Sequence, residues 1–243
     1  MLDSTDSRRL PLLVFSLIGA IALAAVVVIV VFGGEGDLGL RGGNNDSTTG
    51  SQTASGLVPG DPEVVAQDSV AEFTRTHGEP PNTDIARMRI PVLSVDAPVG
   101  LWLVDGNIMP EPYGPVDVAL YDLSGWPGLG GMPGEGRNAI FGGHVDMNRD
   151  IPYAGAHYRG PAVFWAIDQL SPGDIIEVDY AGETLRYAVV WTEAVEVSDG
   201  ANWRQYWSSD VAVDSITLFT CGGEFDFEAH EYSHRVVVRA ERI

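Results

Sequence analysis

The stretch "DSITLFTCGGEFDFEAHEYSHRVVVRAERI", residues 214–243, decides how the folded part of the chain is built. It contains two runs rich in β-branched residues, at 214–221 and 234–241, which predict two β-strands. The first run ends at Cys221, the only cysteine in the sequence, and two glycines follow it directly. The segment between the runs spells H-E-Y-S-H at 230–234. One stretch therefore offers two chemistries, a cysteine nucleophile and a zinc site.

More β-strands are predicted upstream of this stretch, and helical periodicity is scarce from residue 85 onward. An alternating run that contains proline spans residues 87–100, as in an edge strand or a bent strand. A short apolar run, "AIF", ends at Gly142-Gly143. Residues 174–190 are predicted to form two strands joined by a turn at Ala181-Gly182-Glu183. Many short strands separated by turn signals are typical of a closed barrel or a sandwich.

The N-terminal residues divide into an apolar run and a linker. Residues 10–32 carry no charge, and as a helix they would be ~35 Å long, enough to cross a bilayer core of roughly 30 Å. Arg8 and Arg9 precede the run, so the positive-inside rule places residues 1–9 in the cytoplasm. We expect an uncleaved, single-pass anchor in the cell membrane, and a cleaved signal peptide is the alternative. Residues 33–60, rich in Gly, Ser, Thr and Asn, are predicted to be a flexible linker.

A helical appendage is predicted at residues 61–84, before the strand-rich domain of residues 85–243. Ala66, Val70 and Phe73 would share one face of this helix, and His77-Gly78 would end it. We expect the helix to pack on the domain. The alternative is a regulatory segment that covers the active site.

The charge balance excludes several classes of function. All 14 basic residues are Arg, and 34 acidic residues bring the formal net charge to −20. Nucleic acid is therefore not an expected partner, because its phosphates require a basic surface. The absence of Lys also excludes a lysine-based mechanism. One cysteine excludes a disulfide within the chain and leaves Cys221 as either a buried core residue or a nucleophile.

The zinc interpretation depends on a helix. In an H-E-x-x-H site, His230 and His234 would lie one turn apart on a helix, with Glu231 as the general base. Here a β-branched run begins at His234, and Glu241 is the only candidate for a third ligand downstream. We keep a zinc metalloprotease as an alternative function. A non-catalytic, surface-tethered β-domain is a further alternative.

The cysteine interpretation needs a proton carrier and an oxyanion donor as well as the thiol. Cys221 is placed at the tip of a predicted strand. His144 follows another strand through two glycines, which lets the imidazole lie at a strand end. Arg235 opens the last strand and offers a rigid, always charged fork of donors. Arg239, four residues on, lies on the same strand face and is the alternative donor.

These residues stand in motifs that resemble the sortases, the membrane-anchored cysteine transpeptidases of bacterial surfaces. The resemblance covers about residues 85–243, and "TCGG" followed by "EFD" is similar to class E or class F. The motifs are "TLFTCGG" at 217–223, "AIFGGH" at 139–144, "RIPVLSVDAPV" at 89–99, "LSPGDIIEV" at 170–178, and Arg235 at the start of the last strand.

The resemblance implies a fold and an activity. The fold would be all-β, an eight-stranded closed barrel with short helices, preceded by a transmembrane helix and exposed outside the cell. Cys221 would attack an LPxTG-like C-terminal sorting signal to form a thioacyl intermediate. An amine from a cell-wall peptide or a pilin would then release it. His144 would act as general acid and base, and Arg235 would stabilise the oxyanion or hold the substrate.

Further residues are predicted to bind the substrate. The resemblance makes Thr220 a candidate contact and places residues 195–210 beside the sorting-signal site, where aromatic side chains would line it or pack a loop on the barrel. Those aromatic residues are Trp203, Tyr206 and Trp207. No cofactor is expected. The acidic residues Glu224, Asp226, Glu228 and Glu231 have oxygen ligands suited to Ca²⁺, although a solvated loop is the favoured interpretation.

Overall fold

The computed structural model describes residues 62–106, 109–197, 202–226 and 231–243. The predicted membrane anchor, residues 10–32, and the predicted linker, residues 33–60, lie outside the described residues. Within the described ranges, no helix is both long and apolar enough to span a membrane.

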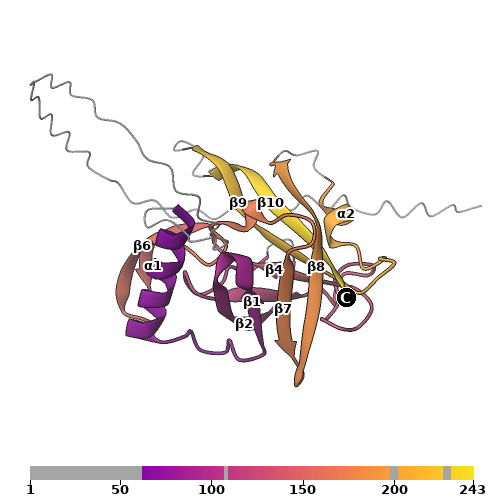
Figure 1. Ribbon diagram of the computed structural model, residues 1–243, viewed down its shortest axis with the longest axis horizontal. Helices are drawn as coiled ribbons and strands as arrows, with labels where there is room; N and C mark the ends of the chain where they lie inside the picture. The colour runs from indigo at the N-terminus through magenta and orange to yellow at the C-terminus, as the bar shows by residue number, and fades with distance from the viewer. Residues whose placement is uncertain (1–61, 107–108, 198–201, 227–230) are drawn as a thin grey trace, which may run out of the picture.

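Eight strands form a closed barrel, in the order β1-β2-β3-β4-β9-β10-β8-β7 (Figure 1). The barrel strands are β1 (Ala86–Ile90), β2 (Val95–Leu103), β3 (Val118–Asp122), β4 (Asn138–Gly142), β7 (Ile175–Tyr180), β8 (Glu183–Glu196), β9 (Ser215–Asp226) and β10 (Glu231–Arg242). Two pairs, β2 with β3 and β4 with β9, are parallel, and the other neighbours are antiparallel. The predicted closed barrel is therefore confirmed, and a sandwich is not formed.

Most strands lie where the sequence predicts them. The strands ending at Gly142 and containing Cys221 are β4 and β9, and the turn between β7 and β8 falls at Ala181-Gly182. The run at 87–100 forms two strands, because the 3₁₀ helix η1 (Pro91–Leu93) separates β1 from β2. Neither is an edge strand, since β1 pairs with both β2 and β7.

One hairpin lies outside the barrel and is not predicted by the sequence. It is the antiparallel pair β5 (Asp146–Ile151) and β6 (Ala156–Pro161). Its strands carry Asp, Asn and Arg, so they lack the apolar alternation that reveals a strand in sequence. The hairpin begins two residues after His144, at the edge of the site described below.

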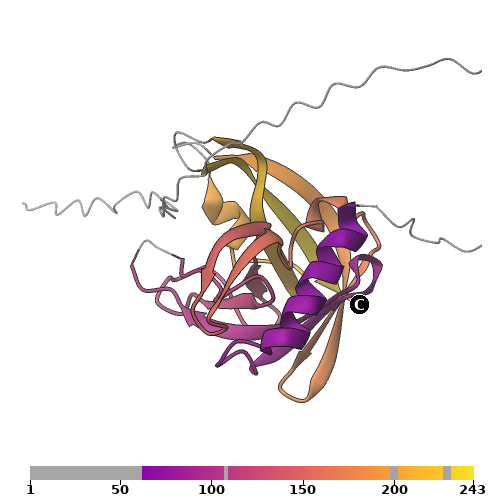
Figure 2. The same ribbon diagram turned by 90° about the vertical axis from the view of Figure 1, so that its left-hand side faces the viewer.

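Helix α1 (Pro62–His77) packs against this hairpin, as Figure 2 shows. Val70 and Phe73 are buried against Met147 and Tyr158, and the Phe73 and Tyr158 rings meet edge to face at 5.0 Å. The predicted helix and its end at His77 are therefore confirmed. Its contacts are with the folded domain, as expected.

The barrel wall has an apolar cluster on each side. Alternate residues of β9 and β10, such as Leu218 and Val236, point into the barrel interior. The intervening residues, such as Phe219 and Val237, point outward into a second cluster beneath the 104–129 segment and the short helix α2 (Trp203–Trp207). Because side chains alternate along a strand, each residue's position in the sequence fixes the side on which it lies.

Candidate active site

Cys221 lies on β9 at the end of its buried part, and its side chain is half-buried. Its partner in the neighbouring strand is Arg235 of β10. Residues directly opposite each other in an antiparallel pair point to the same face of the sheet. The thiol and the guanidinium therefore share one face, the outer face that also carries Phe219 and Val237.

His144 lies beside Cys221 at the end of the adjacent parallel strand. Gly142 of β4 is the register partner of Phe219 in β9, and the Gly143 N–H continues the ladder to the Phe219 carbonyl at 3.3 Å. His144 and Cys221 are each two residues beyond this pair. Neighbouring strands are about 4.8 Å apart, so the register brings His144 and Cys221 side by side, just beyond the end of β4. Two predictions need correction here: β9 continues past Cys221 to Asp226, and β10 begins at Glu231, before Arg235, so neither residue lies at a strand end. The structure thus brings together the three residues predicted to be catalytic.

The His144 imidazole is held through its Nε2 atom. Nε2 lies 3.4 Å from the Pro112 carbonyl oxygen and 3.5 Å from Nη2 of Arg149. The pKa of His144 is lowered to about 4, chiefly by burial and also by the positive charge of Arg149, while Glu111 and the Pro112 carbonyl act in the opposite direction. At neutral pH the imidazole is therefore mostly uncharged, and the imidazolium is a minor form.

Arg235 is buried, with only 6% of its surface exposed. Its Nη1 atom donates to two backbone carbonyls of its own strand, Tyr232 at 3.2 Å and His234 at 3.1 Å. No carboxylate whose placement the structure describes lies within salt-bridge distance of this guanidinium. A buried cation without a carboxylate favours a negative partner. An oxyanion formed beside Cys221 is such a partner.

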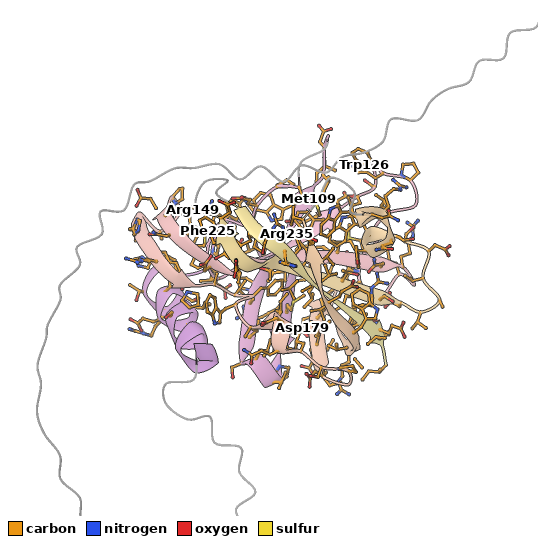
Figure 3. The ribbon with its side chains drawn as sticks, turned by 90° about the horizontal axis from the view of Figure 1, so that it is seen from above. Met109, Trp126, Arg149, Asp179, Phe225 and Arg235 are labelled. Carbon is orange, nitrogen blue, oxygen red and sulfur yellow. The ribbon has the colours of Figure 1, made fainter. Side chains whose placement is uncertain are left out.

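Tyr232 and Tyr121 lie near the thiol, and Tyr232 also contacts Asp146; none of these three residues was predicted from the sequence. The Tyr232 hydroxyl hydrogen bonds to the Asp146 carboxylate, which links β10 to the hairpin. Burial raises the pKa of Tyr232 and of Tyr121, and the negative charge of the Cys221 thiolate adds to both shifts. Both phenols are therefore close enough to Cys221 to feel its charge, and they remain protonated at neutral pH. Figure 3 shows Arg149, Phe225 and Arg235 on one side of the molecule, with Asp179 away from them.

The residues predicted to bind substrate have clear structural contacts. The Thr220 hydroxyl donates to the Gly143 carbonyl at 2.8 Å, so it holds β9 against the residue before His144. Tyr206 and Trp207 are buried in the outer cluster, and Trp207 packs on Phe219 with ring centroids 4.8 Å apart. Trp203 is half-buried at the edge of α2. These contacts hold α2 on the barrel, and the substrate-binding roles stay predictions.

The alternative donor Arg239 serves the fold. Its Nε atom donates to the Thr217 hydroxyl at 2.9 Å and its Nη2 atom to the Tyr206 carbonyl at 3.0 Å. It is the register partner of Thr217, four residues before Cys221 on β9. Its guanidinium therefore ties α2 to the barrel and lies away from the thiol.

The zinc alternative fails on its secondary structure. Residues 231–242 form β10, so Glu231 and His234 lie on a strand and not on the helix that the motif requires. His230 lies outside the described residues, as does Glu228 of the proposed Ca²⁺ ligands. The described residues contain no group of three His, Cys, Asp or Glu side chains placed to hold a metal.

Gly143→Ala is expected to lower activity by displacing His144. A Cβ atom at Gly143 would lie 2.5 Å from the ring of Phe164, which is fully buried and has no room to move. Overpacking of this kind costs about 1–3 kcal/mol, and misplacing a catalytic group by ~1 Å costs up to about a hundredfold in rate. We expect kcat/KM for peptide cleavage to fall about ten- to a hundredfold.

The matched control for this substitution is Gly125→Ala, where an added Cβ would meet nothing within 4 Å. It should leave kcat/KM unchanged. Equal activity of the two variants would show that the Gly143 backbone does not position His144.

Comparisons with known proteins identify the family of the chain. The sortase domain family model matches residues 88–243. Similar solved structures include sortase E1 from Streptomyces coelicolor, with 20% identity, 68% of this chain and 91% of that chain covered, and a TM-score of 0.47. Sortase A from Corynebacterium diphtheriae, a lid mutant, has 19% identity, 74% and 93% coverage, and a TM-score of 0.47. No curated protein matches the chain significantly. The family model spans more than half of the sequence, and the chain therefore belongs to the sortase family of cysteine transpeptidases.

Proposed function

We propose that this sortase cleaves an LPxTG-like C-terminal sorting signal and transfers the cleaved protein to an amine. The observation that supports this best is the placement of Cys221 and Arg235 as register partners on the outer face of β9 and β10, with His144 just beyond the end of the adjacent strand β4. A nucleophile, a proton carrier and a cation for the oxyanion are the groups that acyl transfer needs.

The first half-reaction forms a thioester. The Cys221 thiolate adds to the carbonyl carbon of the signal's Thr, and the negative charge moves to the carbonyl oxygen, where Arg235 donates to it. The C–N bond to the next residue then breaks. His144, as imidazolium, gives its proton to the departing amine. The thioester and a neutral imidazole remain.

The second half-reaction runs in the opposite direction with a different amine. A primary amine adds to the thioester carbonyl and gives a proton to His144, and the C–S bond breaks. The product is an amide, and the thiolate–imidazolium pair is restored. One difficult acyl transfer is thus split into two easier steps.

The rest of the proposal concerns the cellular setting. Residues 10–32 would anchor the chain in the membrane with the catalytic domain outside, where surface proteins that carry a sorting signal pass. The amine would come from a cell-wall peptide or a pilin, and the sequence of the Cys221 motif favours class E or F. The mechanism needs no cofactor, because each proton and charge has a protein group to carry it.

Mass spectrometry of peptide products tests the activity. We expect the full-length chain, incubated with an LPxTG-like peptide and a short oligoglycine amine, to cleave after Thr and to release a peptide–amine conjugate. A matched peptide with the Thr replaced by Val, which keeps the shape and removes the hydroxyl, should react more slowly. Intact peptide after prolonged incubation, with no labelling of Cys221, would support the non-catalytic alternative.

A further inference from the structure

An ion pair next to His144 has no part in the scheme above. Nη1 of Arg149 donates to Oε2 of Glu111 at 2.9 Å, and Nη2 of the same guanidinium lies 3.5 Å from His144 Nε2. Pro112, the residue after Glu111, points its carbonyl at the same nitrogen from 3.4 Å. Both hydrogen-bond contacts that the structure shows for this imidazole therefore involve one atom, Nε2.

The pair is held in place from both ends. Arg149 occupies an inward position of β5, between the buried residues Met147 and Ile151, on the hairpin that packs against α1. On the other side, the buried Asp117 carboxylate accepts the backbone N–H groups of Tyr113 and Gly114, at 2.9 and 2.8 Å. This fixes the turn that follows Glu111 and Pro112. Both groups that contact Nε2, the Arg149 guanidinium and the Pro112 carbonyl, are therefore held in place by their own surroundings.

The two partners of Nε2 suit different forms of the imidazole. The Pro112 carbonyl accepts only, so it binds Nε2 when that atom carries a proton, and the guanidinium donates only. With Nε2–H on the carbonyl, Nδ1 is left to exchange its proton with the reacting groups. The imidazolium and the neutral form that follows proton transfer both keep Nε2–H, so this contact can persist through both half-reactions.

The charges of the pair act on the imidazole in opposite directions. The Glu111 carboxylate raises the pKa of His144 and the Arg149 guanidinium lowers it. The other ionisable groups on neighbouring elements include Cys221 of β9, Asp146 of β5, Tyr121 of β3, Tyr232 and Arg235 of β10, and Asp117 before β3.

We propose that Glu111 and Arg149 are positioning residues that balance the charge around His144 and so set how much of the reactive thiolate–imidazolium pair exists. The Glu111 carboxylate stabilises the imidazolium. The Arg149 guanidinium destabilises the imidazolium by its positive charge, and its ion pair with Glu111 holds that carboxylate near His144. The inference rests on the proposed function, in which His144 is the proton carrier for Cys221.

Alkylation of the thiol measures the amount of the thiolate–imidazolium pair directly, because Cys221 is the only cysteine in the chain. The rate of modification by iodoacetamide follows the thiolate fraction, which a neighbouring imidazolium increases. In the full-length chain at pH 7, Arg149→Gln is expected to raise the alkylation rate about threefold and Glu111→Gln to lower it about threefold, a pKa change of about half a unit for a partly exposed charge. The initial rate of peptide cleavage should change in the same two directions.

The charges of Glu111 and Arg149 can act on the thiolate through the imidazole or directly. Repeating the two substitutions in a His144→Gln variant separates these two routes. If they act through the imidazole, both substitutions leave the alkylation rate unchanged when His144 is absent. Arg159→Gln, an exposed position on the same hairpin, is the matched control and should have no effect in either background. Thermal unfolding of each variant shows whether it is folded.

Changes in the same direction for the two variants, or effects that persist without His144, would overturn the inference. This failure is distinguishable from failure of the proposed function. If the proposed function fails, either the wild-type chain leaves the peptide intact or the Cys221→Ala variant keeps its activity. If only the present inference fails, Cys221 and His144 remain essential while the two charge substitutions do not oppose each other.

Discussion

Replacing Cys221 with alanine is expected to abolish transpeptidation. Cys221 is the only cysteine in the sequence, and the structure places it half-buried within β9, with Arg235 opposite and His144 just beyond the end of the adjacent strand β4. Without the sulfur there is no thioester, and acyl transfer would have to proceed in one step. Single removal of a nucleophile typically costs about 10⁴-fold or more in kcat. The measurement is the initial rate of peptide cleavage and of conjugate formation.

Cys221→Ser is the matched variant, since it keeps the size and one polar atom. Its hydroxyl is a far weaker nucleophile at neutral pH than a thiolate, so it too should be nearly inactive. Both variants should unfold at temperatures close to that of the wild type, because the side chain is not fully buried. Substantial cleavage by either variant would mean that another group carries out the attack.

Arg235→Ala is also expected to produce a large loss, about 10²–10³-fold in kcat, the range measured when one oxyanion donor is removed. The reason is the position of the guanidinium, buried on the same face as the thiol and without a described carboxylate partner. Arg235→Lys should recover only part of this loss. A lysine keeps the positive charge, but its ammonium group cannot reproduce the two parallel hydrogen bonds that a planar guanidinium can donate.

The control for Arg235 is Arg186→Ala on β8, where the side chain is half exposed and pairs with Glu177 at 3.6 Å. An exposed pair of this kind contributes about 0–1 kcal/mol, so activity should be unchanged. If Arg235→Ala kept wild-type kcat and raised only KM, the guanidinium would bind the substrate in its ground state and would not stabilise the oxyanion.

Much of the barrel could be predicted from local patterns. β-Branched runs identified β9 and β10, and two glycines marked the end of β4. The polar hairpin could not be found this way, because only Met147 and Ile151 of β5 are deeply buried and they are four residues apart. Its stability comes from packing on α1, which is distant in the sequence. The strand β3 was not predicted, because four of its five residues are buried and it lacks the apolar–polar alternation that marks a strand in sequence.

The residues of the candidate site also fall into those that the sequence predicts and those that only the structure shows. Cys221, His144 and Arg235 could be predicted because each stands in a recognisable local motif. Glu111 and Arg149 could not, since their contact joins residues 38 positions apart and neither is marked by its neighbours in sequence. Tyr232 was adjacent to the predicted residues, but only the fold shows that its hydroxyl meets Asp146 from the hairpin.

The most direct test of the account is the covalent intermediate. The full-length chain would be mixed with an LPxTG-like peptide in the absence of an added amine, quenched in acid, and measured by intact mass and then by peptide mapping. We expect a mass increase equal to the acyl fragment, located on Cys221 and lost on addition of hydroxylamine or the amine. Cleavage of the peptide with no adduct, or an adduct on any other residue, would contradict the central claim that Cys221 is the nucleophile.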